Sequence, residues 1–310
     1  STLFPYTTLF RSPYSYKAHA ALTNLGGITK DNNHIGRLAR LISATRDPIA
    51  FVHLCHAAAR EHDAIGNYAQ AWDLLGKAKR VLRENIRTPS ESPERLADAL
   101  AVPSTPGALP GAGCDSSRPI FVVGMPRTGT TVVDRILSNH PQVCSIGESW
   151  AFSALMRGQF DGRSAQIIDV ATIDKARDCA DLSGIGAAYI ARARHAAGNF
   201  PRFVDKLHLN IFLAGFIQRA LPQARIVCVV RHPLDTIVSN YKQLFEYSTP
   251  NYQYSLDLTL AARFYVQFRR LVALWRAAFP ARFYAVEYES LVADPIRETR
   301  ALFDFCELSL

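Results

Sequence analysis

One segment constrains the fold more than any other. Gly124 to Thr131 reads Gly-Met-Pro-Arg-Thr-Gly-Thr-Thr, which has the spacing of a phosphate-binding P-loop. The apolar, β-branched run Pro119 to Val123 precedes it, and an amphipathic stretch from Thr131 to Ser138 follows it. Strand, glycine loop and helix therefore come in the order of an α/β fold. The loop is built to hold an anion, because a helix N-terminus offers unpaired backbone N–H groups and the positive end of its dipole.

The loop lacks the lysine with which nucleoside triphosphatases reach the β and γ phosphates, since Thr130 stands in its place. Its cation is Arg127, inside the turn, and the hydroxyls of Thr130 and Thr131 open the helix. An NTPase also needs an apolar strand that ends in a magnesium-binding Asp. The candidate in this sequence is only the short Phe203-Val-Asp205, which Lys206 follows directly. We therefore expect a phosphorylated ligand and disfavour a metal-dependent kinase or NTPase.

A second anion site is predicted where the apolar strand Arg225 to Val230 is followed by Arg231. Ligands of doubly wound sheets bind at the carboxyl ends of the strands, so this guanidinium should point into the same crevice as the loop. Ser239 lies one helical turn past the expected helix cap Asp235, so its hydroxyl can join Arg231 on one phosphate. The alternative is that Arg231 pairs with a surface carboxylate. Because the loop also carries an arginine, Arg127, we favour an anionic ligand.

The composition is that of an ordinary globular protein, with 310 residues, 48% hydrophobic and 20% charged. The formal charge is +8, and 28 of the 35 basic residues are Arg, which suits phosphate and carboxylate ligands. The arginines are dispersed without an aromatic and basic stripe, so nucleic acid is not an expected partner. The six cysteines form no C-x-x-C pair, and no apolar run approaches the ~20 residues of a membrane span. We expect no metal site, no membrane insertion and a cytoplasmic location.

The sequence divides into four parts. Residues 1–12 show neither helical nor strand periodicity and are expected to be non-native or disordered, whereas residues 13–87 predict an all-α region. Residues 88–117 are rich in Pro, Gly, Ser and Ala and are expected to be a linker. Residues 118–310 alternate strands and helices, which predicts a parallel β-sheet flanked by helices on both faces. The expected strands are 119–123, 143–146, 202–206, 225–230 and 282–287, and the expected helices include 130–138, 209–220, 235–246 and 257–279.

The helical region contains Gly66-x-Tyr68-x-x-Ala71-x-x-x-Leu75-x-x-Ala78, which has the small and large positions of a tetratricopeptide helix pair. The small residues should let two antiparallel helices approach, and Tyr68 and Leu75 should fill the space between them. A single repeat cannot bury its own face, so a generic helical hairpin packed on the next domain is an equal alternative.

Four stretches, in this order, resemble the sulfotransferases, and in particular the bacterial branch with an N-terminal tetratricopeptide region that is similar to tyrosylprotein sulfotransferases. They are Pro119 to Thr131, Val204 to Asn210, Ala224 to Thr236 and Tyr288 to Pro295. The likeness covers about residues 17–308. It implies an enzyme that transfers a sulfuryl group from 3′-phosphoadenosine-5′-phosphosulfate (PAPS) to a hydroxyl acceptor, without metal. The acceptor would be a protein tyrosine, a small molecule or a glycan.

The resemblance also implies donor-binding residues. The loop residues match the segment that holds the 5′-phosphosulfate, and two later residues match the clamp on the 3′-phosphate. These are Arg127, Thr128, Gly129, Thr130 and Thr131 for the first group, and Arg231 and Ser239 for the second. Arg127 is counted as catalytic as well. Lys206 matches the lysine that contacts the bridging oxygen and stabilises the leaving bisphosphate.

Two residues compete for the role of the base that takes the acceptor's proton. Glu148 matches the catalytic glutamate of the tyrosylprotein-like branch. His208 departs from that branch, which usually has Pro at this position, but cytosolic small-molecule sulfotransferases place a catalytic His two residues after a similar Lys. We favour Glu148 and keep His208 as the alternative.

The family's C-terminal segment, which carries further nucleotide contacts, would lie beyond Leu310, so the resemblance predicts a domain truncated at this end. A hypothesis from another class is therefore a tetratricopeptide interaction protein whose P-loop domain is inactive. In either case the helical repeats would offer a surface to a protein partner.

Overall fold

A computed structural model gives the fold of residues 15–86, 91–102, 113–162, 164–247 and 249–309. The predicted non-native segment 1–12 and most of the sequence around Pro106 and Pro110 lie outside the described residues. Backbone contacts divide the chain into two compact units. One unit comprises residues 1–87 together with 242–248, and the other comprises residues 88–241 and 249–310.

The first unit is helical, as predicted. Its helices are α2 (Tyr16–Thr23), α3 (Ile35–Ala44), α4 (Pro48–Ala64) and α5 (Tyr68–Asn85). α4 begins with Pro at its first position after the capping carboxylate of Asp47, which accepts a hydrogen bond from the amide of Ile49 at 2.9 Å. Gly66, at φ 84°, takes the left-handed conformation that ends α4 and returns the chain along it as α5.

The expected role of Tyr68 is wrong. Leu75, Ala71 and Ala78 are buried as predicted, but Tyr68 is 68% exposed. Tyr68 is the first residue of α5, and helical side chains lean toward the N-terminus, so its ring projects beyond the end of the helix pair. The helix pair itself is present, while its assignment to the tetratricopeptide class stays a prediction.

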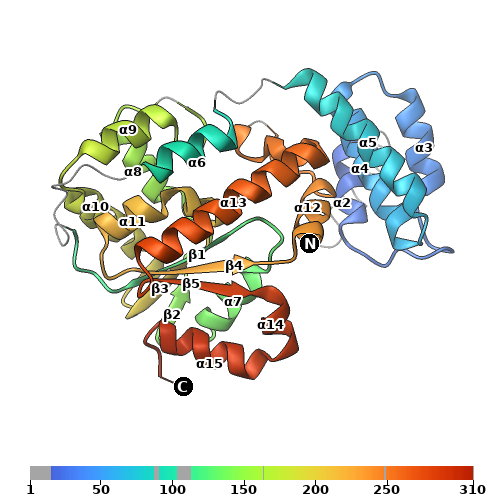
Figure 1. Cartoon of the computed structure of the whole chain (residues 1–310). Coiled ribbons are helices and arrows are strands. Elements are labelled where there is room, and N and C mark those ends of the chain that lie inside the picture. Colours follow the sequence, from blue (N-terminus) through green and yellow to red (C-terminus); the bar gives the residue numbers. More distant parts are fainter. Residues whose placement is uncertain (1–14, 87–90, 103–112, 163, 248, 310) are drawn as a thin grey trace. The chain divides into compact units, whose positions relative to one another are not determined.

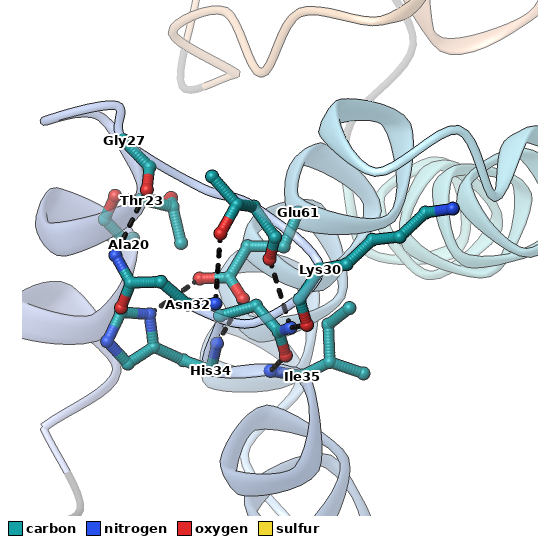
Figure 2. Close-up of polar contacts among 10 residues, drawn as sticks. Ala20, Thr23, Gly27, Lys30, Asn32, His34, Ile35 and Glu61 are labelled. Carbon is teal, nitrogen blue, oxygen red and sulfur yellow. Dashed lines mark hydrogen bonds and ion pairs between the residues drawn. The ribbon is translucent and has the colours of Figure 1, made fainter.

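A buried carboxylate joins two helices of this unit (Figure 2). Glu61 of α4 is fully buried and accepts the backbone N–H of His34 at 2.5 Å and pairs with His34 Nδ1 at 2.9 Å. His34 stands immediately before α3, so Glu61 holds the residue at which the helix begins, and Asn33 Oδ1 accepts the first helical amide, that of Ile35, at 3.3 Å. The preceding loop is closed by Asn32, whose side-chain amide donates to the carbonyl of Gly27 at 3.1 Å.

The first unit also contains a segment from late in the chain, residues 242–247. The sequence predicts a helix over 235–246, but α12 ends at Tyr241. Side chains of α4 and α5 bind the carbonyls that a longer helix would have used: His56 Nε2 lies 3.0 Å from the Lys242 oxygen, and Lys79 Nζ donates to the Gln243 oxygen at 2.5 Å. Lys242 Nζ pairs with Asp63 at 2.6 Å. Long-range contacts therefore end the helix earlier than its periodicity suggests.

The second unit is built on a five-stranded parallel sheet with the order β2-β3-β1-β4-β5. The strands are β1 (Pro119–Gly124), β2 (Val143–Ser145), β3 (Arg202–Asp205), β4 (Arg225–Val230) and β5 (Phe283–Glu287). All four pairings are parallel, and the register places Ile120 beside both Val204 and Arg225. The predicted α/β class and the parallel sheet are confirmed.

Helices cover both faces of the sheet, which explains why its central strands are apolar throughout (Figure 1). Phe121 and Val123 point into a core with helices α6, α8, α9, α10, α11 and α13. Ile120 and Val122 point into a second core with α7, α14 and α15. The bounds are α7 (Thr130–Ser138), α8 (Ala151–Gln159), α9 (Val170–Asp178), α10 (Ser183–Ala197), α11 (Ala214–Ala220), α12 (Pro233–Tyr241), α13 (Leu258–Ala278), α14 (Tyr288–Ala293) and α15 (Pro295–Phe305). Two 3₁₀ helices, η1 (His208–Leu213) and η2 (Pro250–Leu256), precede α11 and α13.

Part of the expected linker is a structured element of the second unit. Helix α6 (Pro93–Ala101) starts behind Ser92, whose hydroxyl accepts the amide of Arg95 at 3.2 Å. Its buried residues Leu96 and Leu100 belong to the core on the α13 side of the sheet. The sequence carries the signal, because Ser followed by Pro is typical of a helix start, but the surrounding Pro-rich composition obscured it.

None of the helices among the described residues is both long and apolar enough to cross a membrane.

Candidate functional site

The predicted site residues lie at the carboxyl ends of four neighbouring strands. Arg127 follows β1, and the flanking strands contribute Lys206 after β3 and Arg231 after β4. Glu148 follows β2, which is the outer neighbour of β3. Because the strands are parallel, these ends share one edge of the sheet, where ligands of doubly wound folds bind. Arg127 and Arg231, which are 104 positions apart in the sequence, are in direct contact there.

The glycine loop connects β1 to α7 through residues 125–129. No side chain caps the N-terminus of α7 at Gly129, so the first amides of the helix lack the oxygen partner that a cap would give. The hydroxyl of Thr128 is buried and donates to the carbonyl of Met125 at 2.8 Å, which fixes the turn. Gly129 is left-handed at φ 102°, and a Cβ there would overlap the ring of Tyr288. Only glycine fits this position.

Two threonines open α7 as the sequence predicts. Thr130 is buried and Thr131 is exposed at the first turn. The helix dipole and the uncapped amides make this turn favourable for an anion. The loop therefore has the backbone of a phosphate-binding turn with no lysine side chain in it.

Arg127 and Arg231 form one cationic cluster. Arg127 is exposed in a left-handed conformation, with φ 67°, and its Nε donates to Ser239 Oγ at 3.4 Å. Arg231 donates from Nη1 to the Arg127 carbonyl at 3.1 Å, and its guanidinium lies 4.8 Å from the centroid of the Tyr288 ring. A left-handed non-glycine residue costs of order 1 kcal/mol and often marks a functional turn.

Ser239 and Arg231 have different partners in the structure, and their joint contact with one phosphate stays a prediction. Its hydroxyl contacts Arg127 of the loop, while Arg231 pairs with Asp235 at 3.5 Å. Asp235 lies in the first turn of α12 and not at its cap, because the helix already begins at Pro233. The Nε of Arg231 is buried without a hydrogen-bond partner among the described residues. An unused guanidinium donor therefore remains beside the loop.

The sequence reasoning missed residues that hold this cluster in place. Asn240 of α12 is fully buried and donates to the carbonyl of Pro126 at 2.8 Å, and Tyr254 donates to the Asn240 side-chain oxygen at 2.9 Å. Tyr265 of α13 donates to the Arg231 carbonyl at 2.9 Å. Tyr288 directly follows β5, so its place at the carboxyl edge was readable from the strand pattern. Asn240 and Tyr254 gave no such signal.

A second cluster forms at the ends of β2 and β3. Lys206 Nζ contacts Glu148 Oε1 at 2.7 Å. The lysine side chain is 14% exposed and the glutamate 47% exposed, so the pair opens to solvent on the glutamate side. The amide of Lys206 also donates to the Gly147 carbonyl at 2.8 Å. The structure thus brings the two predicted residues into one ion pair.

His208 lies at the start of η1 in the same cluster. Its ring is buried, with the centroid 5.6 Å from that of Tyr252, and its Nε2 has no hydrogen-bond partner among the described residues. Burial lowers the pKa of His208 to about 4, an effect that nearby Glu148 opposes and Lys206 reinforces. The imidazole is therefore neutral near pH 7, with one ring nitrogen unused.

The carboxyl group of Asp205 organises this cluster. From the sequence, Asp205 is considered only as a candidate magnesium ligand. Asp205 is fully buried and accepts the Tyr189 hydroxyl at 2.7 Å and the amide of Leu207 at 3.2 Å. It also contacts Asn210 Nδ2 at 3.4 Å and a backbone group of Ser149. Burial raises the pKa of Asp205 to about 7. Its partners flank both Glu148 and Lys206, so this carboxyl fixes the relative position of the two.

The geometry suits transfer of an anionic group without a covalent bond between that group and the protein. The loop and its arginines can hold phosphate oxygens, and Lys206 lies on the adjacent strand as a further cation. Glu148 and His208 both lie within this second cluster as proton acceptors.

Comparisons with known proteins identify the family of the chain. Residues 119–310 match the profile of the sulfotransferase family. An uncharacterized protein of Aquifex aeolicus (strain VF5) is 30% identical over 250 residues, which cover 78% of this chain and 33% of that protein. A putative protein-tyrosine sulfotransferase of Caenorhabditis briggsae is 26% identical over 191 residues, covering 61% of this chain and 65% of that protein. The chain thus spans less than two thirds of the length of either relative.

Among solved structures, the sulfotransferase domain of the Synechococcus PCC 7002 olefin synthase aligns with a TM-score of 0.44 and 20% identity. The alignment covers 65% of this chain and 76% of that domain.

Proposed function

The chain belongs to the sulfotransferase family, and from this premise we propose that it transfers a sulfuryl group from PAPS to a hydroxyl acceptor. The observation that carries the proposal is the grouping of three cations at one edge of the sheet. Arg127 in the loop, Lys206 on one side and Arg231 on the other surround an uncapped helix N-terminus. That grouping suits an anion with more than one charged group. It supplies the positive charge that a lysine supplies in the P-loop of nucleoside triphosphatases.

The residues present fit the donor. The amides at the start of α7, with Arg127, Thr128, Gly129, Thr130 and Thr131, would hold its 5′-phosphosulfate, and Arg231 with Ser239 would hold its 3′-phosphate. The buried Nε of Arg231, which lacks a partner among the described residues, supports this fit. When bound, PAPS supplies a sulfuryl group activated as a phosphosulfate anhydride.

Lys206 contributes a positive charge at the end of β3. Fixed cations lower the barrier most where negative charge develops in the transition state. In the ion pair with Glu148 this charge is held in place and partly neutralised. We propose that an anionic ligand at the loop competes with Glu148 for Lys206, which frees the carboxylate as the lysine turns toward the ligand.

Glu148 is the base that we propose, with His208 as the alternative. Glu148 Oε1 contacts Lys206, and the exposure of the side chain leaves the carboxylate open to an acceptor hydroxyl. His208 is neutral and has an unused Nε2, but its low pKa makes it a weak base. The exposed carboxylate of Glu148 is therefore favoured over the buried imidazole, and the unused nitrogen keeps His208 in the cluster as a hydrogen-bond partner for the acceptor.

The acceptor is proposed as a hydroxyl group on a protein tyrosine, a small molecule or a glycan. Tyr252 borders the Glu148 cluster and presents an aromatic surface beside His208.

The helical unit is proposed to be tetratricopeptide-like and to contact a protein partner, since α4 and α5 form a helix pair with a small-residue face. The proposed domain bounds are 13–87 for this region and 118–310 for the transferase domain.

Transfer of radiolabel from ³⁵S-PAPS to a panel of acceptors tests the proposal. The panel contains a tyrosine peptide flanked by acidic residues, a simple phenol, an aliphatic alcohol and an oligosaccharide. Label should appear in at least one hydroxyl acceptor without added metal and should disappear in Lys206→Ala. If the protein binds the nucleotide but labels no acceptor in any class, the inactive interaction protein becomes the better account.

A further inference from the structure

The opposite edge of the same sheet carries a second cluster of arginines. Arg202 begins β3, Arg225 begins β4, and Arg282 directly precedes β5. Each therefore stands at the amino-terminal end of its strand, whereas the proposed donor site lies past the carboxyl ends. A strand rises about 3.3 Å per residue, so Arg225 and Arg231 are separated by about 20 Å along β4. The two arginine clusters are separate places on the molecule.

The alternation of side chains puts these arginines under the α15 face of the sheet. Arg202 points to the same face as Val204, two residues on, and Arg225 to the same face as Val227, and both valines belong to the core beneath α7, α14 and α15. The ring of Phe305 at the end of α15 lies 5.3 Å from the Arg225 guanidinium. The guanidinium groups thus lie where the apolar core ends, and the side chains of Arg202 and Arg225 are only 9% and 10% exposed.

One carboxylate serves this cluster. Glu307 pairs with Arg225 through Nη2 and approaches Arg202 Nη1 at 3.9 Å. Arg225 Nη1 donates to the Ala281 carbonyl at 2.7 Å, and Arg282 Nη2 donates to the side-chain oxygen of Gln223. Among the described residues, Glu307 is the carboxylate that pairs with these arginines, so positive charge exceeds negative charge at this nearly buried place.

Several donors of the cluster have no acceptor. The Nε and Nη2 of Arg202 and the Nε of Arg225 are buried without a hydrogen-bond partner among the described residues. A buried donor without a partner is costly, and more so when it is charged, so such donors normally have a partner such as an ordered water or a bound anion. Burial lowers the pKa of Arg202 from its ordinary value; Cys306 and Glu307 oppose this effect, and the neighbouring Arg225 and Arg282 add to it.

We propose that Arg202, Arg225 and Arg282 form a binding site for a tetrahedral oxyanion, phosphate or sulfate, either as the free ion or as the end of a monoester. Guanidinium groups bind such oxygens through paired N–H donors, and three of them around one ion would satisfy the unused nitrogens. Glu307, which is 61% exposed, lies at the solvent side of the cluster and opposes the anion by its charge. Glu307 therefore partly neutralises the arginines and lowers their affinity for an anion.

The test uses the full chain with the double substitution Arg127→Ala and Arg231→Ala, so that the proposed donor site cannot bind the probe. Inorganic phosphate is titrated by calorimetry and by thermal shift, with chloride at equal ionic strength as the control for general screening. We expect saturable binding that weakens at least tenfold in Arg202→Gln and strengthens at least threefold in Glu307→Gln. Glu307→Gln is an exposed change that keeps the fold, so the test does not depend on a variant that fails to fold.

Glycerol 2-phosphate distinguishes the two sources of the ligand. Tighter binding than inorganic phosphate supports a monoester as the occupant, and weaker binding supports the free ion. The proposal is overturned if no saturable phosphate binding occurs, or if binding is the same in Glu307→Gln and Arg202→Gln as in the parent. These outcomes do not depend on sulfuryl transfer, so failure of the proposed function and failure of this site are distinguishable.

Discussion

The two edges of the sheet hold their arginines and lysines in different ways. At the carboxyl edge, Arg127, Lys206 and Arg231 each come from a different loop, beside the free amides of a helix start. At the amino edge, Arg202 and Arg225 belong to the strands themselves and pack against the core. Arg127 is exposed at the carboxyl edge, whereas the side chains of Arg202 and Arg225 at the amino edge are only 9% and 10% exposed. We therefore assign chemistry to the carboxyl edge and binding or stability to the amino edge.

The largest effect is expected at Lys206. Lys206→Ala should lower kcat by about 10²–10³-fold and leave donor affinity within a few-fold, because the charge matters most in the transition state. Lys175→Ala is the matched control, since Lys175 is 55% exposed on α9 and its partner Asp161 is itself a surface residue. Steady-state kinetics with labelled donor measures both values. An equal loss in the two variants would contradict a special role for Lys206.

The next largest effect on kcat is expected for the residue that acts as the base. Glu148→Gln should lower kcat by about 10²-fold or more, while His208→Ala should lower it less. The pKa of His208 is about 4, so His208 is neutral above pH 5, and loss of His208 should not change the pH dependence between pH 6 and 8. The measurement is the pH profile of kcat/KM for both variants. Our assignment of Glu148 fails if His208→Ala alone abolishes turnover.

Arg231 is expected to act on binding. Arg231→Ala should weaken adenosine 3′,5′-bisphosphate about 10- to 100-fold, which is the usual loss for a charge-assisted contact with phosphate. Arg225→Gln at the amino edge should change stability and leave this affinity unchanged. Arg297→Ala, on the surface of α15, is the control for loss of one positive charge. If Arg225→Gln weakens the bisphosphate as much as Arg231→Ala does, the two edges are not independent.

Much of the second unit could be predicted because its signals are local. The strand over 225–230 and the helix over 130–138 match β4 and α7, since an apolar run or an amphipathic stretch with clear flanking residues sets each of them. The common location of the glycine loop, Lys206 and Arg231 could be predicted because each follows a strand, and a parallel sheet brings its carboxyl ends to one edge. Glu148 and Lys206 form an ion pair there, while their roles stay a prediction.

The features that escaped prediction depend on contacts between distant parts of the chain. Helix α12 ends early because His56 and Lys79 bind the carbonyls that follow it. The partners of Asp205 come from α10, η1 and the loop after β2, so no spacing in the sequence shows its role. The amino-edge arginines look dispersed in the sequence, and only the strand register gathers them.

A smaller effect concerns Asp205, the buried acid of the carboxyl edge. Its pKa is raised from the ordinary value of 3.8 to about 7, mainly by burial. Between these values the folded protein keeps a proton that the unfolded chain has lost, so the stability contributed by this carboxyl falls as pH rises from about 4 to about 7. Asp205→Asn cannot ionise. Its free energy of unfolding should therefore rise relative to that of the parent across this window, by on the order of 1–4 kcal/mol.

Chemical denaturation of the two proteins at several pH values measures this difference. A difference that stays constant with pH would mean that Asp205 ionises normally, and would remove the reason to treat it as a partly protonated positioning group.

The most direct test of the central claim is calorimetric titration of the full chain with adenosine 3′,5′-bisphosphate in the presence of a chelator, compared with Mg-ATP. The account predicts that the bisphosphate binds without metal, more tightly than Mg-ATP, and that binding is lost when Arg127→Ala and Arg231→Ala are combined. Tighter binding of Mg-ATP than of the bisphosphate, or bisphosphate binding that survives both substitutions, would contradict it.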